Sequence, residues 1–268
     1  MKPNPAEANA GRFTGFADVY DKYRPRPPRA VIDLLARLAE APRPRLVVDL
    51  GCGTGLSTRM WADVAEEVIG IEPSDDMREE ARRRTAAANV SYRRGFAHAT
   101  KLPDQSADIV TCSQSLHWMD PEPTFREVRR ITRPGGVFAA IDCDWPPRTS
   151  SREVEQAYMD TMGRRLKLAA SVGEDPGPRW AKEGHLARMR ESGLFASTRE
   201  VVLEHMEMGS ADRIVGLALS MGSIQKCLKA GLSQADLGLD ELRSIARRAF
   251  GDAPVPWYFT YRVRIGVV

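Results

Sequence analysis

The sequence predicts an α/β fold in which a doubly wound, mostly parallel sheet is covered by helices on both faces. Between residues 46 and 141, short and continuous apolar segments alternate with amphipathic ones. A glycine-rich turn follows the first apolar segment, and the first two apolar segments each contain or end in an acidic residue. Continuous apolar strands that alternate with helices are typical of parallel sheets that are buried on both faces.

Five strands and four helices are expected in the first part of the chain. The strands are expected at 46–50, 68–72, 90–93, 108–113 and 136–141. The helices are expected at 31–40, 56–66, 74–88 and 121–132, where apolar residues recur about one turn apart. Ser74, followed by Asp75 and Asp76, is expected to cap the third of these helices, because these residue types suit a helix N-terminus.

Beyond Asp142 the alternation stops and helices dominate. Helices are expected at 150–171, 182–192, 212–221 and 234–250, with a turn at 173–178 and a strand at 198–208. In the tail, apolar residues alternate from Trp257 to Ile265, which predicts an antiparallel strand that is half-exposed or at an edge. The last two strands would complete a seven-stranded sheet and leave the helices as a cap insertion. The expected division is an N-terminal lid segment (1–30), a ligand-binding core (31–145), and the cap with the last two strands (146–268).

Composition restricts the classes of partner. The 268 residues contain 39 Lys and Arg against 36 Asp and Glu, and a net charge of +3 is too small to indicate nucleic acid. The longest apolar run, Gly136–Ile141, is far shorter than a membrane helix, and the N-terminus has no apolar signal region. Four cysteines without a CxxC pair suit a reducing compartment and predict no metal site. Composition therefore favours a cytoplasmic protein without a membrane or nucleic-acid partner. We also expect a monomer or homodimer.

The glycine-rich turn between the first strand and the next helix indicates a nucleoside ligand. Gly51, Gly53 and Gly55 allow a tight turn and a close approach of the backbone to a ligand. Glu72 ends the next strand about 20 residues later, where an acid can accept both ribose hydroxyls. Dinucleotide sites space their glycines G-x-G-x-x-G, but here the third glycine comes one residue early. Asp49 would disfavour a pyrophosphate and suits the ammonium of an amino-acid tail or the donors that hold that tail.

The segment Asp49-Leu50-Gly51-Cys52-Gly53-Thr54-Gly55-Leu56-Ser57 resembles motif I of the class I S-adenosylmethionine (SAM)-dependent methyltransferases. Similar family patterns occur at 68–74, 102–110 and 133–136, so the resemblance covers roughly residues 13–145. It implies a Rossmann-like core that binds SAM, releases S-adenosylhomocysteine (SAH) and transfers a methyl group. The cofactor-binding residues that it implies around the first two strands are Asp49, Gly51, Cys52, Gly53, Gly55, Glu72, Pro73 and Met77.

Two further segments, 16–25 and 114–118, resemble the small-molecule branch that includes the trans-aconitate methyltransferases. This resemblance implies that an aromatic N-terminal segment closes over the cofactor and that the stretch after the fourth strand faces the methyl group or the acceptor. The residues carried over are Tyr20, Tyr23, Arg24, Gln114 and His117, and we expect Ser113 and Trp118 to contact the cofactor as well. In the loop after the third strand, Phe96, Ala97 and His98 would contact the adenine, with His98 standing where the family usually has an acid.

His117 is the candidate catalytic residue. It follows the fourth strand, at the edge where open α/β sheets bind ligands. It could act as a general base, position the cofactor or acceptor, or make a structural hydrogen bond, and the sequence leaves these roles open. Trp118 could form a pocket wall or a cation–π contact to the sulfonium. Cap arginines, Arg148, Arg152, Arg164 and Arg165, would suit an acidic acceptor.

Other functions stay open. A nucleic-acid methyltransferase would be expected to carry an Asn/Asp-Pro-Pro-aromatic motif after the fourth strand, whereas this chain has Ser113–Leu116 there and Asp144–Pro147 one strand too late. A protein methyltransferase is a further alternative. A nicotinamide-dependent oxidoreductase is disfavoured by the glycine spacing and Asp49, and a non-catalytic SAM-binding regulator would share the same cofactor site.

Overall fold

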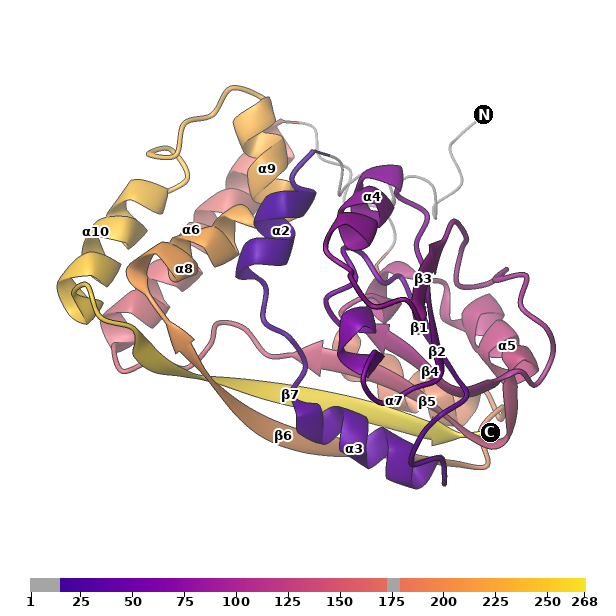
Figure 1. Cartoon of the computed structure of the whole chain (residues 1–268). Coiled ribbons are helices and arrows are strands. Elements are labelled where there is room, and N and C mark those ends of the chain that lie inside the picture. The colour runs from indigo at the N-terminus through magenta and orange to yellow at the C-terminus, as the bar shows by residue number, and fades with distance from the viewer. Residues whose placement is uncertain (1–14, 173–178) are drawn as a thin grey trace.

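Seven strands form one sheet in the computed structural model, which describes residues 15–172 and 179–268 (Figure 1). The strands are β1 (Leu46–Leu50), β2 (Glu67–Ile71), β3 (Val90–Arg93), β4 (Ala107–Ser113), β5 (Thr132–Cys143), β6 (Ser197–Gly209) and β7 (Val255–Val267). Their order is β3-β2-β1-β4-β5-β7-β6, and β7 runs antiparallel to both of its neighbours. The predicted Rossmann-like, doubly wound sheet with an antiparallel last strand is confirmed.

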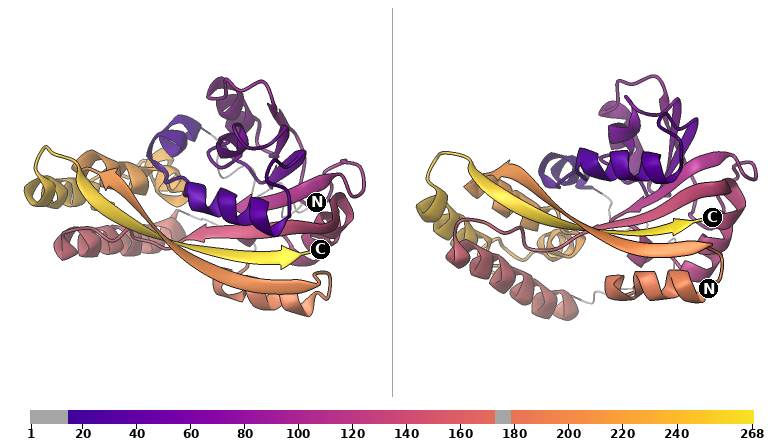
Figure 2. Two further views of the ribbon diagram at one scale, coloured as in Figure 1. Left: turned by 60° about the horizontal axis from the view of Figure 1, so that its bottom comes forward. Right: turned by 90° about the horizontal axis from the view of Figure 1, so that it is seen from below.

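Alternate residues of the central strands enter two separate apolar cores. Val47 packs with Val31 and Leu35 of α3 (Arg29–Leu38) and with the cap. Its neighbour Val48 packs on the other face with α5 (Pro121–Ile131) and α7 (His185–Glu191). Figure 2 shows α3 and α7 on opposite sides of the sheet. The continuous apolar strands of the sequence therefore reflect burial on both faces.

The cap is a group of helices at one end of the sheet (Figure 1). Its members are α6 (Arg152–Ser171), α8 (Ala211–Leu219), α9 (Gly222–Lys229) and α10 (Leu239–Phe250), with α2 (Ala17–Tyr23) packed against α8. β6 and β7 form a long antiparallel pair, called the hairpin below although α8, α9 and α10 connect its two strands. The hairpin joins the cap to the sheet, because its outer part extends past the end of β5. In that outer part, Trp257 and Phe259 are buried against the cap helices.

Of the two expectations for the tail, a half-exposed strand is confirmed and an edge strand is wrong. β7 lies between β5 and β6, and β6 forms the edge. The alternating residues from Trp257 to Ile265 are buried as predicted, whereas Tyr258 on the opposite face is about half exposed. The alternation therefore reports one exposed face of the hairpin rather than an unpaired edge.

The predicted helix at 56–66 is also wrong, because only a short 3-10 turn, η2 (Thr58–Trp61), forms there. The hydroxyls of Ser57 and Thr58 donate to Asp49, and the amide of Asn89 donates to the carbonyls of Ala62 and Ala65. These contacts hold the segment as a compact loop in place of helical hydrogen bonds.

The remaining helices differ from the predictions mainly at their ends. α4 spans Asp75–Arg83, and the hydroxyl of Ser74 accepts from the amide of Met77, so the predicted cap is confirmed. α9 was not expected, and the helix predicted from residue 234 begins at Leu239, after a turn built on Ser233 and Asp236. None of the described helices combines the length and apolar character needed to cross a bilayer. The expected turn at 173–178 and the first part of the N-terminal lid lie outside the described residues.

Candidate functional site

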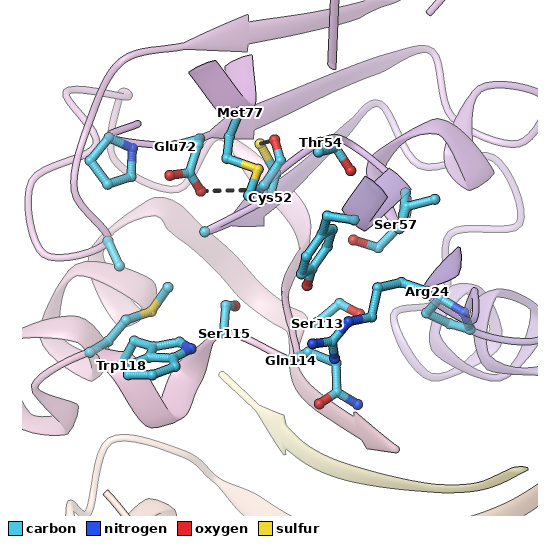
Figure 3. A pocket seen from close by; sticks show the side chains of 18 of the residues that line it. Arg24, Cys52, Thr54, Ser57, Glu72, Met77, Ser113, Gln114, Ser115 and Trp118 are labelled. Carbon is cyan, nitrogen blue, oxygen red and sulfur yellow. Dashed lines mark hydrogen bonds between the residues drawn. The ribbon is translucent and has the colours of Figure 1, made fainter. Parts of the chain in front are cut away.

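A cavity of about 550 Å³ opens at the carboxyl ends of β1, β2 and β4, next to α2 (Figure 3). Most of the residues proposed from the sequence line it. They are Tyr20, Arg24, Gly51, Cys52, Gly53, Glu72, Pro73, Met77, Phe96, Ala97, His98, Ser113, Gln114 and Trp118. The four other proposed residues, Tyr23, Asp49, Gly55 and His117, are not among the lining residues.

Two glycines of the turn after β1 have different structural roles. Gly53 has a φ of +55°, and a Cβ placed on it would meet nothing within 4 Å, so the backbone is open to the cavity. Gly55 has a φ of +79°, and a Cβ placed on it would lie 2.2 Å from the hydroxyl of Tyr92. The first glycine lets a ligand approach the backbone, and the second lets the turn pack against β3.

The carboxylate of Glu72 is fixed at the wall of the cavity by the backbone. Its Oε2 accepts from the amide of Gly53 at 3.0 Å, and its Oε1 accepts from the amide of Ser74 at 2.9 Å. Burial raises the pKa of Glu72, and the two amides and the charge of Arg78 oppose that rise. Each carboxylate oxygen can accept a further hydrogen bond, which is what a vicinal diol requires.

Asp49 does not line the cavity, so of the two expected roles the structure favours the indirect one, in which Asp49 holds donors near the ligand. Its carboxylate is fully buried and accepts from the hydroxyls of Ser57, Thr58 and Thr111 at 2.7, 2.7 and 2.9 Å. Burial raises the pKa of Asp49, and these three hydrogen bonds oppose the rise. Asp49 therefore ties the loop after β1 to β4, and it influences the cavity only through Ser57, which lines it.

Beyond Glu72, one end of the cavity is a slot formed by the loop after β3. Gly95, Phe96, Ala97 and His98 line it, and the rings of Phe96 and His98 stack with centroids 5.6 Å apart. Ser115 and Met119 line the cavity as well, and the hydroxyl of Ser115 donates to the carbonyl of Leu50. A flat heterocycle attached to a diol at Glu72 would suit this slot.

Helix α2 places a cation at the opposite end of the cavity. Asp21 is buried against Arg59, which also donates to the carbonyl of Thr54 in the loop after β1. Tyr23 packs over Gly216 of α8, where a Cβ would lie 2.3 Å from the ring. Tyr23 therefore docks α2 on the cap, which corrects its expected role as a cofactor contact. Arg24 lines the cavity, with its guanidinium carbon 4.9 Å from the ring of Tyr20 and 5.1 Å from that of Trp145.

The structure argues against His117 as a general base. The ring does not line the cavity, and its buried Nδ1 has no hydrogen-bond partner among the described residues. Burial, with the positive charges of Lys182 and Arg179, lowers the pKa of His117 to about 2, so it is a very weak base near neutral pH. Its carbonyl accepts from the amide of Trp180, which makes His117 part of the connection between β4 and the cap.

Several lining residues were missed from the sequence. Cys143 and Trp145 follow or end β5, Trp180 precedes α7, and Tyr261 belongs to β7. The alternation of the tail carried a signal for Tyr261, because it placed that ring on the buried face. Nothing local marked Trp180, whose place depends on how the cap folds back over the sheet.

The four cap arginines expected to meet an acidic acceptor do not line the cavity. Arg164 pairs with Glu241, Arg148 with Glu155, and Arg165 donates to Ser223. The cationic group at the cavity is instead Arg24. Among residues 15–172 and 179–268, no cluster of three His, Cys, Asp or Glu residues could hold a metal ion.

The order and directions of the seven strands are those of the Rossmann-like methyltransferase fold. Residues 48–140 match the model of the methyltransferase domain family. A solved structure from Anaeromyxobacter dehalogenans, provisionally assigned as a type II methyltransferase, superposes with a TM-score of 0.65 at 27% identity, over 91% of this chain and 98% of that one.

Curated relatives show the same likeness over part of their length. The chain is 34% identical to an uncharacterized methyltransferase of Mycobacterium tuberculosis over 166 residues, which is 62% of this chain and 60% of the relative. It is 31% identical, over 45% of this chain and 43% of the relative, to a Saccharomyces cerevisiae protein provisionally assigned to the SAM-dependent methyltransferases. The aligned segments thus span at most about 60% of these relatives.

Proposed function

We propose that the chain transfers the methyl group of SAM to a small-molecule acceptor and releases SAH. The observation that carries the proposal is the carboxylate of Glu72, which two backbone amides fix beside the open backbone of Gly53. This pairing supplies the diol acceptor and the unobstructed turn that an adenosyl ligand needs.

The described residues fit the cofactor along the whole cavity. Glu72 would accept from the ribose hydroxyls, and the slot lined by Phe96, Ala97 and His98 would take the adenine. The amino-acid tail would extend past Gly53 toward Arg24 and Ser113, which also line the cavity. SAM supplies a methyl carbon on a sulfonium, so the protein has only to hold a nucleophile in line with that carbon and exclude water.

A small acceptor is favoured because three further aromatic rings line the rest of the cavity. Trp145, Trp180 and Tyr261 line it together with the turn after β1, so cofactor and acceptor have to share about 550 Å³. A nucleic acid would have to insert a flipped base, and a protein a side chain, beneath these rings. The resemblance to the trans-aconitate branch supports the same choice of acceptor.

The acceptor proposed here is acidic, in keeping with the electrostatics of the site. Arg24 has no carboxylate partner among the described residues, and its Nε and NH2 groups bond to Ser220. A carboxylate nucleophile needs no general base, and the low pKa of His117 leaves that histidine a poor one. An anionic acceptor would therefore match both the charge of Arg24 and the absence of His117 from the cavity lining.

Calorimetry and a transfer assay test the proposal. We expect the purified chain to bind SAH and not NADH, and to transfer tritium from [methyl-³H]SAM to a compound in a panel of small carboxylic acids. Binding of NADH without SAH would favour an oxidoreductase. Binding of SAH without transfer to any small molecule would favour a regulator, and transfer to oligonucleotides or peptides alone would refute the small acceptor.

A further inference from the structure

We propose that Lys182, which does not line the cavity, is a positioning residue for the acceptor. It holds the side chain of Gln114 so that the amide NH2 group can donate to an anionic oxygen of the acceptor. This inference rests on the proposed function, and it adds a residue from η4 (Lys182–Gly184) to the machinery of that site.

The contact with Lys182 identifies the oxygen and the nitrogen of the Gln114 side-chain amide. The Nζ of Lys182 lies 2.6 Å from Oε1 of Gln114 and 2.9 Å from Oδ1 of Asp142. An ammonium group has only donors, so its partner on Gln114 has to be the carbonyl oxygen. The NH2 group is therefore held on the side away from Lys182.

The NH2 group that remains has nothing to donate to in the protein. The Nε2 of Gln114 is buried and lacks a hydrogen-bond partner within the described part of the chain. The backbone of Gln114 is held in place as well, because its φ is +54° and its backbone N–H donates to the carbonyl of Ile141. A buried donor without a partner costs free energy unless a ligand satisfies it, and Gln114 lines the cavity.

Lys182 is itself fixed by a chain of charges that crosses three strands. Asp142 of β5 is only 4% exposed and accepts from Arg264 of β7 at 2.8 Å. Arg264 also pairs with Glu200 of β6 at 2.7 Å. The position of the Lys182 ammonium is therefore set by the sheet, although its backbone belongs to the connection that leads to α7.

The class of ligand follows from the groups that meet in the cavity. The side chains of Arg24 and Gln114 reach into the same part of it (Figure 3). One carries a positive charge without a carboxylate partner among the described residues, and the other carries an unsatisfied donor. Both favour an oxygen with negative charge, and the rings of Trp145 and Trp180 favour a flat apolar body.

The test uses the full chain saturated with SAH, titrated with benzoate, cinnamate and indole-3-acetate and with the corresponding amides. We expect the acids to shift the side-chain NH2 signals of Gln114 in ¹H–¹⁵N spectra and the amides to leave them nearly unchanged. Lys182→Met should weaken binding of the acids about tenfold, while SAH affinity stays within twofold. Lys182→Arg, which keeps the charge and the donors, should restore much of that loss.

Lys226→Met is the matched control, because it removes one exposed lysine of α9 and should change neither affinity. The inference is overturned if no acid shifts the Gln114 signals, or if Lys182→Met binds the acids as well as the wild type does. A wild-type chain that fails to bind SAH would refute the proposed function instead. If Lys182→Met destabilises the protein, SAH affinity will be lost too. In that case the Gln114 signals of the wild type still show whether the acids contact its NH2 group.

Discussion

The two ends of the cavity are built in different ways. At the cofactor end, Gly53, Glu72 and Phe96 come from consecutive loops after β1, β2 and β3, and backbone amides fix the one charged group. At the acceptor end, Arg24, Gln114, Trp180 and Tyr261 come from four distant segments, and side chains fix one another. The first arrangement is set by sheet topology and the second by how the cap packs, so mutations should separate the two.

The largest expected effect is at the cofactor end. Glu72→Ala should weaken SAH binding by about 10- to 100-fold, since a charged hydrogen-bond acceptor is worth about 1.5–3 kcal/mol. Calorimetry with SAH measures the change. Glu67→Ala, at the exposed start of β2, is the control and should bind like the wild type. Equal affinities in the two variants would remove Glu72 from the site.

The next largest effect should appear at the acceptor end alone. Trp180→Ala removes one wall of the cavity but keeps the backbone amide that donates to His117. We expect the KM of the acceptor to rise roughly tenfold, in line with an aromatic contact of about 1–1.5 kcal/mol, with SAH affinity unchanged. Tyr258→Ala, on the exposed face of the hairpin, serves as the control. A matching loss of SAH affinity would contradict the division into two ends.

A smaller effect should appear in the pH dependence of stability, and it should come from the acceptor end. Burial lowers the pKa of His117 to about 2 and that of His185 to about 4, from an ordinary value of 6.5. As the pH falls, these histidines are therefore protonated in the unfolded chain at a higher pH than in the folded chain. The free energy of unfolding should be highest above pH 6.5 and fall as the pH drops toward 4, by at most about 1.4 kcal/mol per pH unit for each histidine.

Urea unfolding between pH 7.5 and 4.5 measures this dependence. His117→Asn should flatten the curve below pH 6.5, because one of the two groups no longer takes up a proton on unfolding. A curve as steep as that of the wild type would show that His117 does not titrate as the structure implies.

The smallest effect should be on turnover in the same variant. His117→Asn should keep kcat within about threefold of the wild type, with the same pH profile, because a group of such low pKa is a poor base at neutral pH. Steady-state kinetics from pH 6 to 9 provide the check. A loss of 100-fold or more, within the range typical of a general base, would return His117 to the reaction.

The same contrast explains what the sequence could predict. The sheet and most of the cofactor end follow from local patterns, since strands bury both faces and ligands bind at their carboxyl ends. Glu72 could be placed from its position at a strand end alone. The sequence left two roles open for Asp49, because the three hydroxyls that hold its carboxylate come from two separate segments. Trp180 and Lys182 depend on long-range packing that no periodicity records.

The hairpin of β6 and β7 has one more consequence. Gly209, which ends β6, pairs directly with Val255, which begins β7. Everything between them, α8, α9 and α10 included, therefore leaves and re-enters the sheet through two adjacent residues. Such an insertion can be lengthened, shortened or exchanged as one unit without breaking the pairing of β6 with β7, and none of residues 210–254 lines the cavity, so the lining itself need not change.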